Sequence, residues 1–399
     1  MRIVIAPDSF KGSLTARQAA DAIESGVLRA IPDAECVTIP MADGGEGTVR
    51  ALVDATGGAF VTARVTGPLG TPVDAVYGML GDGRTAVIEM AAASGIQHVG
   101  AADRDPLTAT TYGTGELIRD ALDHGADRII VGLGGSATND GGAGMAQALG
   151  VRLLDGAGRD LPFGGAALAE LADIDCSGMD PRLAGTDVRL ACDVTNPLTG
   201  PRGASAVFGP QKGATPVMVE RLDRALAHYA AVVRDRLGRK IDAVPGSGAA
   251  GGLGAGFLAF TDATMASGID IVTEATGLKA KAAGADWCIT GEGGIDAQTR
   301  YGKTPLGVAR AVREAAPGCR VVALAGTVGE GSEGLYDLGF DAIFGIMPGV
   351  ATMSEAVEHA AANLERTAEN VARLIAAARP AASGDEATGP HDGRRMADG

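Results

Sequence analysis

The chain has 399 residues, of which 34 are Lys or Arg and 49 are Asp or Glu, so its formal charge at pH 7 is −15. So acidic a chain is a poor candidate for binding nucleic acid, because neutralising phosphates requires clustered basic residues. Apolar residues make up 46 % of it, which is enough for a core and too much for a disordered chain, and at roughly 100–200 residues per domain the length suggests two or three domains.

Short apolar runs alternate with helical patterns in the first part of the chain. The run at Arg2–Ala6 predicts a buried strand, and apolar residues at helical spacing across Thr15–Ala30 predict a helix. A strand and a second helix follow, at Cys36–Ile39 and Glu46–Ala55. Turn signals then separate three runs of alternating character, which predict antiparallel strands, at Ala59–Thr66, Val73–Leu80 and Thr85–Met90.

The alternation of strands and helices resumes after these runs. The predicted helices and strands lie at Gly115–His124, Arg128–Gly132, Ala143–Leu149, Trp287–Thr290, Arg320–Ala325 and Ala342–Ile346, and a long last helix covers Ser354–Ala378. Such units predict a parallel sheet covered by helices, and the antiparallel excursion indicates a second, inserted domain. We predict an α/β domain at 1–65 plus 255–378, an inserted α/β domain at 66–254, and a disordered tail at 379–399.

Cysteine usage and the N-terminus indicate the cellular compartment. The five cysteines are widely separated and form no C-x-x-C pair, so neither a disulfide framework nor a thiolate zinc site is indicated. The first residues lack the charged region of a signal peptide, and no run approaches the roughly 18 apolar residues of a membrane span. We therefore expect a cytoplasmic protein.

Two polar segments follow the first two predicted strands, where parallel sheets bind ligands. In PDSFKGSLTA, Lys11 and Ser13 precede a helix start that suits an anion, although Ser13 or Thr15 could simply cap the helix. In PMADGGEGT, Asp43 and Glu46 bracket two glycines and could hold Mg²⁺ or accept a proton from a hydroxyl, although the pattern is also typical of a bare turn.

The segment GLGGSATNDGGAG, Gly132–Gly144, is the most specific of the Gly-rich loops. Asn139 and Asp140 can reach a metal or a substrate hydroxyl. Amides and hydroxyls of the loop can form a concave nest for an anion, with Gly134, Gly135, Ser136 and Thr138 as its members.

A long segment at Ala191–Ala214 mixes acidic and basic residues. Asp193 stands at the end of a further strand, within ACDVT, and Arg202 and Lys212 stand among Gly and Pro. Fixed cations of this kind can steady a transferring phosphoryl group, although they can also be ordinary surface charges.

Two further segments resemble nucleotide motifs without matching them fully. GSGAAGGLGAG fits G-x-G-x-x-G through Gly246, Gly248 and Gly251, but no apolar strand precedes it, so an anion loop or a close helix contact is favoured over a dinucleotide site. In TGEGGIDAQTRYGKTP, carboxylates at the end of a strand precede a lysine that opens a helix, but the Gly that a P-loop needs is replaced by Ala297. The residues in question are Glu292, Asp296 and Lys303.

Taken in order, these segments resemble the type I glycerate kinase family of bacteria. The matching stretches span Ala6 to Pro305 and read APDSFKGSLTA, PMADGGEGT, VIEMAAASG, TTYGTGELI, GLGGSATNDGGAGMAQALG, CDVTNPLTGPRGASAVFGPQKGAT, GSGAAGGLGAGFLAF and TGEGGIDAQTRYGKTP. One departure is Gly294, which stands where family members usually have Arg after GEG; Arg300 could supply that cation.

The resemblance implies ATP-dependent, Mg²⁺-requiring phosphorylation of D-glycerate, with 2-phosphoglycerate favoured over 3-phosphoglycerate as the product. It also implies two α/β domains, a Rossmann-like one with a parallel sheet and an inserted flavodoxin-like one, with the active site in the cleft between them. ATP and D-glycerate are then the partners, without nucleic acid or membrane, and the protein is a monomer or homodimer.

Within that function the residue roles are our hypotheses. The Gly134–Ser136 nest and the Gly246–Gly252 loop would cradle phosphates, and Asp193, with Asp43 as second candidate, would be the base near the hydroxyl. The remaining groups would bind the charges of the reaction: Lys11 and Lys212 the transferring group, Arg202 the substrate carboxylate, and Glu292 and Asp296 the Mg²⁺. An NAD-dependent dehydrogenase and a non-catalytic binder of phosphorylated metabolites stay open as other classes.

Overall fold

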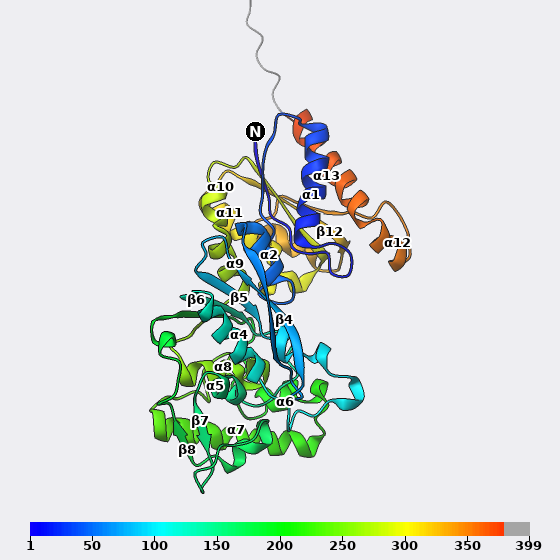
Figure 1. Ribbon diagram of the computed structural model, residues 1–399. Helices are drawn as coiled ribbons and strands as arrows, with labels where there is room; N and C mark the ends of the chain where they lie inside the picture. Colours follow the sequence, from blue (N-terminus) through cyan, green and yellow to red (C-terminus); the bar gives the residue numbers. More distant parts are fainter. Residues whose placement is uncertain (379–399) are drawn as a thin grey trace, which may run out of the picture.

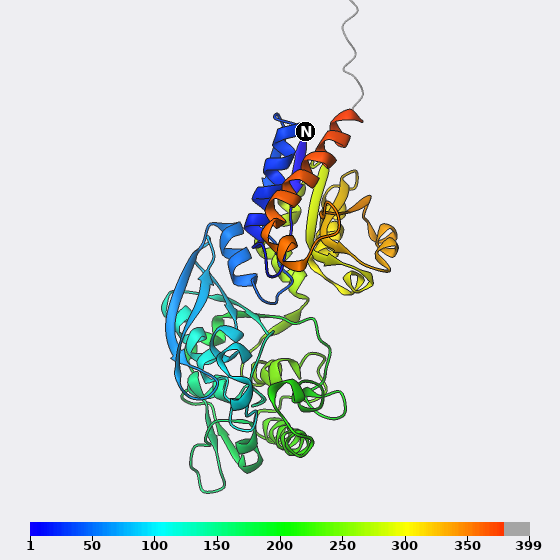
Figure 2. The ribbon, with the colours of Figure 1, turned by 90° about the vertical axis from the view of Figure 1, so that its right-hand side faces the viewer.

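Two β-sheets, one in each of two stacked lobes, organise the chain in a computed structural model that describes residues 1–378 (Figures 1 and 2). The predicted disordered tail, 379–399, lies outside the described residues. Among residues 1–378, none of the helices combines the length and the apolar character that crossing a membrane requires.

The upper lobe is built on a five-stranded, all-parallel sheet in the order β13-β12-β11-β1-β2. The strands are β1 (Arg2–Ile5), β2 (Glu35–Thr38), β11 (Trp287–Ile295), β12 (Arg320–Val328) and β13 (Ala342–Gly345). The helices are α1 (Ala16–Ala30), α2 (Thr48–Thr56), α9 (Gly268–Thr276), α10 (Leu278–Ala282), α11 (Thr304–Ala315), α12 (Met353–Glu358) and α13 (Ala360–Ala377).

The lower lobe contains a six-stranded sheet in the order β10-β9-β6-β5-β4-β3 and a small two-stranded sheet. Its strands are β3 (Ala59–Thr66), β4 (Pro72–Met79), β5 (Thr85–Glu89), β6 (Arg128–Gly132), β7 (Arg152–Leu154), β8 (Asp173–Asp175), β9 (Asp187–Ala191) and β10 (Thr264–Ala266). Its helices are α3 (Ala91–Ser94), α4 (Tyr112–Asp123), α5 (Ala143–Ala148), α6 (Ala204–Phe208), α7 (Pro216–Leu237) and α8 (Ala249–Phe260).

The α/β class with parallel sheets is confirmed, and β3, β4 and β5 pair antiparallel as predicted. Numbered within the upper sheet, the strand order is 2-1-3-4-5, which is the flavodoxin-like order, whereas the resemblance implied a Rossmann-like arrangement for this part. Sheet membership divides the chain near residues 58 and 267, since β3 and β10 both belong to the lower sheet. The domain bounds themselves stay a prediction.

The clearest differences from the predicted elements concern β11 and the last helix. β11, predicted to stop at Thr290, continues to Ile295 because its glycines still pair with β12, with Gly294 opposite Thr327. The single last helix is wrong, because the chain breaks at His359 into α12 and α13. α12 buries no residue, whereas α13 packs against α1 (Figure 2).

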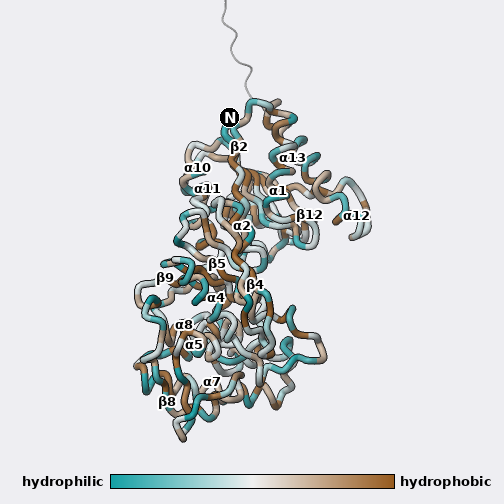
Figure 3. The backbone as a smooth tube through the Cα atoms, viewed as in Figure 1, coloured by the Kyte–Doolittle hydropathy of each residue, from teal (hydrophilic) through white to brown (hydrophobic). Residues whose placement is uncertain are grey.

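The apolar core is continuous across the waist between the lobes. Helices α2 and α9 contribute Leu52 and Val272 to one buried cluster, which also includes Val4 of the upper sheet and Ile130 of the lower sheet. Strongly hydrophobic segments accordingly occupy the strands inside both lobes in Figure 3. Because the core passes through α2 and α9, the two sheets are held in a defined relation to each other.

The carboxyl edges of the two sheets converge on the loop that follows β2. A Cβ at Gly44 would come within 2.7 Å of the Cα of Gly268 and 2.9 Å of the Cβ of Ala191, and one at Gly132 would meet the carbonyl of Gly44 at 2.7 Å. Only glycine permits this approach, and φ is +89° at Gly44. Loops at the ends of β1, β2, β6, β9 and β11 are thereby brought into one region.

Candidate active site

Four cavities lie where the carboxyl edges of the two sheets converge, and they are joined through shared side chains. Asp8 and Lys11 line both an α1–α2 cavity of about 360 Å³ and a switch-point cavity of about 650 Å³. Asp43 lines both the switch-point cavity and an inter-lobe cavity of about 280 Å³. Asp193 lines both the inter-lobe cavity and an α9–α11 cavity of about 890 Å³. Loops far apart in the sequence therefore meet in one crevice.

The switch-point cavity lies between the ends of β1 and β11, which are adjacent strands that the chain leaves in opposite directions along the sheet. Such a reversal of strand order is where open α/β sheets bind ligands. The loop after β1 is tied to β11 by a hydrogen bond of 2.8 Å from the amide of Asp8 to the carbonyl of Gly291. The floor of the switch-point cavity is charged. It is lined by Asp8, Lys11, Asp43, Glu292, Asp296 and Lys303.

Asp8 is a site residue that the sequence analysis missed. Its side chain is only 6 % exposed, and it accepts hydrogen bonds of 2.5 Å from the hydroxyl of Thr304 and from the amide of Ser9. Burial raises the pKa of Asp8 to about 6, with the nearby charge of Asp43 adding to the shift and the Thr304 hydrogen bond opposing it. Its position directly after a predicted buried strand could have identified Asp8 as a candidate, but Lys11 and Ser13 of the same segment were chosen instead.

Glu292 and Lys303 form the opposite side of this charged floor. Burial raises the pKa of Glu292 to about 7, although the positive charge of Lys303 opposes the shift. The Lys303 ammonium lies 3.6 Å from Glu292 and donates a hydrogen bond of 3.2 Å to the carbonyl of Gly294. Asp296 caps the turn that follows, because its carboxylate accepts a 2.7 Å hydrogen bond from the amide of Gln298.

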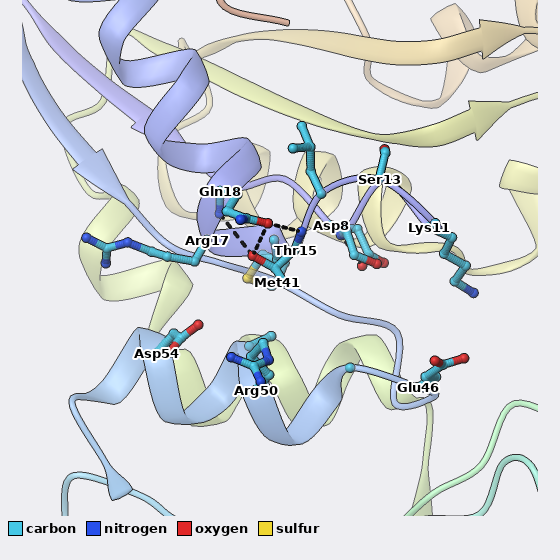
Figure 4. Close-up of a pocket in the computed structure, with 16 residues that line it drawn as sticks. Asp8, Lys11, Ser13, Thr15, Arg17, Gln18, Met41, Glu46, Arg50 and Asp54 are labelled. Carbon is cyan, nitrogen blue, oxygen red and sulfur yellow. Dashed lines mark hydrogen bonds between the residues drawn. The ribbon is translucent and has the colours of Figure 1, made fainter. Parts of the chain in front are cut away.

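The α1–α2 cavity opens beside the start of α1 (Figure 4). Thr15 is the N-cap, and it forms a capping box with Gln18. Ser13 does not cap the helix; its hydroxyl donates a 2.9 Å hydrogen bond to the carbonyl of Phe10. In Figure 4, Lys11 and Glu46 lie at the same end of the cavity, and both side chains are exposed.

The inter-lobe cavity brings together the Gly134–Ser136 turn, Asp43, Asp193 and Lys212. Lys212 is buried, and its ammonium donates a 2.6 Å hydrogen bond to the carbonyl of Thr138. Burial lowers the pKa of Lys212 to about 7, against the attraction of Asp140. Asp193 is exposed within the crevice, whose walls still remove enough water to raise the pKa of its carboxyl.

The second half of the Gly132–Gly144 segment turns toward the protein interior. Thr138 and Asn139 are fully buried, and the amide group of Asn139 donates a 2.8 Å hydrogen bond to Ser205. The carboxylate of Asp140 accepts hydrogen bonds from the amide and hydroxyl of Thr111 and from the amides of Gly142 and Gly144. Asp140 therefore holds the loop in shape and does not face the crevice.

The glycines of the G-x-G-x-x-G segment pack against other backbone. A Cβ at Gly248 would meet the carbonyl of Pro197 at 2.2 Å, and one at Gly251 would meet that of Thr138 at 2.0 Å. Gly246 has φ of +86° and abuts Met265 and Cys192. The segment reaches the inter-lobe cavity only through Ala249 and Ala250.

The predicted site residue Arg202 has an exposed side chain that lines none of the four cavities. Its backbone carbonyl accepts a hydrogen bond from Asn196. Arg300, offered in place of an arginine at position 294, lines the α9–α11 cavity.

The carboxylates of the crevice are oxygen donors of the kind that Mg²⁺ prefers. Within residues 1–378, no three Asp, Glu, His or Cys side chains are already arranged as a complete metal site. Mg²⁺ usually keeps several waters and takes one or two carboxylates together with substrate phosphates. Asp8, Glu292 and Asp296 fit an ion that arrives bound to a nucleotide.

Comparison with known proteins gives concordant matches over nearly the whole chain. The model of the glycerate kinase family matches residues 3–376. A glycerate kinase from Bacillus subtilis is 54 % identical over 379 residues, covering 95 % of this chain and 99 % of the relative, and a glycerate 2-kinase from Escherichia coli is 51 % identical, covering 94 % and 98 %. A crystal structure described as a glycerate kinase 2 from Salmonella typhimurium LT2 superposes with a TM-score of 0.87 at 52 % identity, covering 94 % of this chain and 98 % of that one.

Proposed function

The chain belongs to the glycerate kinase family, and from that premise we propose that it transfers the γ-phosphoryl group of ATP to the 2-hydroxyl of D-glycerate. The observation that carries the proposal is the position of Asp43 on the wall shared by the switch-point and inter-lobe cavities. A nucleotide in the larger cavity and a three-carbon acid in the smaller one would meet beside it. A cytoplasmic location and a monomeric or homodimeric state belong to the same proposal.

Catalysis of phosphoryl transfer consists mostly of positioning and of stabilising charge. In the inter-lobe cavity, the Gly134–Ser136 turn and Lys212 would bind the anionic groups that meet there, which are the substrate carboxylate and the transferring phosphoryl group. Asp193 would accept the proton of the attacking hydroxyl, with Asp43 as the alternative base. This arrangement gives Arg202 and the Gly246–Gly252 glycines no direct part, because they line none of the cavities.

On the nucleotide side, Lys11 and Lys303 would bind phosphate oxygens. Mg²⁺, when bound with ATP, would neutralise phosphate charge, and Asp8, Glu292 and Asp296 would hold it. Lys303 lies close to the carbonyl of Gly294. It can therefore supply the positive charge that relatives usually place on an arginine at that position, whereas Arg300 faces another cavity.

No specific observation favours a dehydrogenase, because neighbouring backbone packs directly against the glycine loop that would bind NAD. The direct test is a coupled assay of ADP release with ATP and D-glycerate, with L-glycerate as the control. Phosphorus NMR of the product would distinguish 2-phosphoglycerate from 3-phosphoglycerate. Absence of ADP release from folded protein would refute the kinase proposal, and 3-phosphoglycerate would refute only the choice of hydroxyl.

A further inference from the structure

One wall of the switch-point cavity is apolar and uncovered. It consists of Met347 and Val350 in the loop after β13 and Met353 and Val357 of α12, which we call the apolar wall. Val350 is fully exposed, Met353 is 77 % exposed and Val357 is 39 % exposed. Apolar side chains gathered at the mouth of a cavity are typical of a ligand-binding surface.

The apolar wall does not take part in the core of the upper lobe. α12 buries none of its residues, and burial begins at Ala360, the first residue of α13. In Figure 1, α12 stands out from the lobe at its right-hand edge. Folding alone therefore does not account for the methionines and valines of this segment.

The backbone of the same wall also has hydrogen-bonding groups to spare. The amides of Met347, Gly349, Val350 and Ala351 donate no hydrogen bond to any part of the chain that the structure describes. The neighbouring amides of Ile346 and Thr352 are both satisfied, by Ala325 and Glu355. A flat ligand against the wall would thus find apolar contact on its face and backbone donors at its edge.

The opposite side of the cavity has the complementary character. Lys11 and Lys303 provide positive charge beside the carboxylates of Asp8, Asp43, Glu292 and Asp296, which suit a divalent cation, and glycines 293, 294 and 326 also line this side. A ligand that matches both sides of the cavity therefore combines an apolar end with an anionic end that brings its own divalent cation. D-glycerate has no apolar part, so it does not meet this description, whereas a nucleoside triphosphate does.

We propose that the apolar wall binds the purine base of ATP, with the triphosphate directed toward Lys11, Lys303 and Asp43. The inference rests on the proposed kinase function and adds the place of the base. The polarizable sulfurs of Met347 and Met353 suit an aromatic ring. The apolar wall itself has no aromatic side chain, and Phe10, which also lines the cavity, is only 2 % exposed. The γ-phosphate end then points to the inter-lobe cavity.

The test is Met353→Glu, because this side chain lies at the first position of α12, where an acidic residue is compatible with the helix. The matched control is Leu374→Glu, an apolar residue of α13 that is 64 % exposed and lines none of the cavities. We expect the KM for ATP to rise about tenfold, while kcat at saturating ATP and the KM for D-glycerate change less than about twofold. Binding of inorganic tripolyphosphate, measured by calorimetry, should stay unchanged.

The outcomes separate the inference from the function on which it rests. An unchanged KM for ATP in active Met353→Glu protein would refute the proposed base-binding site but not the kinase function. A Met353→Glu variant whose main effect is an altered oligomeric state would refute the base-binding site in the same way. Equal weakening of ATP and tripolyphosphate also overturns it, because the wall would then act on phosphates. Wild-type protein that releases no ADP with D-glycerate refutes the proposed function itself. Met353→Ala, with a smaller rise in the KM for ATP, repeats the test without added charge.

Discussion

The amide of Gly268 donates a hydrogen bond of 3.1 Å to the carboxylate of Asp193. Gly268 begins α9, and Asp193 follows β9 of the lower sheet, so the bond joins the helix between the lobes to the crevice. A Cβ on Gly268 would come within 1.9 Å of the carbonyl of Asp43. A single glycine therefore contacts both residues that we propose as candidate bases, Asp193 through its carboxylate and Asp43 through its backbone carbonyl.

The first prediction concerns Asp193 as the base. Asp193→Asn retains a side-chain oxygen for the amide of Gly268 but cannot accept a proton, so kcat should fall by at least about 100-fold with the fold intact. Steady-state kinetics and circular dichroism measure the two properties. Asp270→Asn is the matched control, since Asp270 lines the α9–α11 cavity but not the inter-lobe cavity. A near-normal rate in Asp193→Asn would assign the proton to another group, with Asp43→Asn as the next variant.

The second prediction concerns Asp8 and the metal. Asp8→Asn keeps a hydrogen-bond partner for Thr304 but removes one negative charge from the switch-point cavity. The Mg²⁺ concentration for half-maximal activity should therefore rise on the order of tenfold. Titration of activity with Mg²⁺ at fixed free ATP measures it. Asp54→Asn, which changes a carboxylate of the α1–α2 cavity, should behave as wild type; an equal shift in both variants would mean a general effect of charge.

The third prediction contrasts two cations of the Ala191–Ala214 segment, Arg202 before α6 and Lys212 after it. Lys212→Ala removes a buried ammonium from the inter-lobe cavity and should lower kcat at least about 100-fold. Arg202→Ala removes an exposed side chain outside the cavities and should change kcat and the KM for D-glycerate less than about twofold. Kinetics of the pair decide between the geometry and the role suggested for Arg202 by the sequence alone. A large rise in the KM for D-glycerate in Arg202→Ala would restore that role.

The fourth prediction uses the low pKa of Lys212. Burial lowers this pKa to about 7 from 10.5, so between these values the unfolded chain binds a proton that the folded chain does not. The free energy of unfolding should therefore rise with pH across this window, by at most about 1.4 kcal/mol per pH unit from this residue. Urea denaturation of wild type and Lys212→Met at pH 7 and pH 9 isolates the contribution. Parallel changes in both proteins would show that Lys212 does not titrate in this window.

The sequence predicted the features that depend on local pattern. Apolar runs at β1 and β6 and the helical spacing of α1 located these elements, and a strand followed by polar Gly-rich residues located Asp43, Gly134 and Asp193. The sequence pattern does not predict which way a side chain points within a loop. Asp140 and Arg202 resemble their neighbours in composition, yet one turns inward to hold backbone and the other lies in solvent.

The features that the sequence did not predict depend on contacts between residues far apart in the chain. The G-x-G-x-x-G segment has the glycines of a phosphate loop, but they serve close packing against the Gly132–Gly144 loop and Pro197. β11 is longer than predicted because β12 pairs with its glycines. Burial raises the pKa of Asp8, and its carboxylate accepts a hydrogen bond from Thr304, a residue 296 positions away in the chain.

The last prediction tests that packing role. Gly251 and Gly238 have nearly equal φ, +70° and +71°, but a Cβ at Gly251 would lie 2.0 Å from the carbonyl of Thr138, whereas one at Gly238 would meet nothing within 4 Å. Gly238→Ala should therefore cost only the backbone strain, about 1–2 kcal/mol of unfolding free energy. Gly251→Ala should cost clearly more, because the Thr138 carbonyl that receives the Lys212 hydrogen bond must move. Chemical denaturation of both variants measures the difference. Equal losses would mean that the segment can relax, and a Gly251→Ala protein of normal stability with a raised KM for ATP would return this loop to phosphate binding.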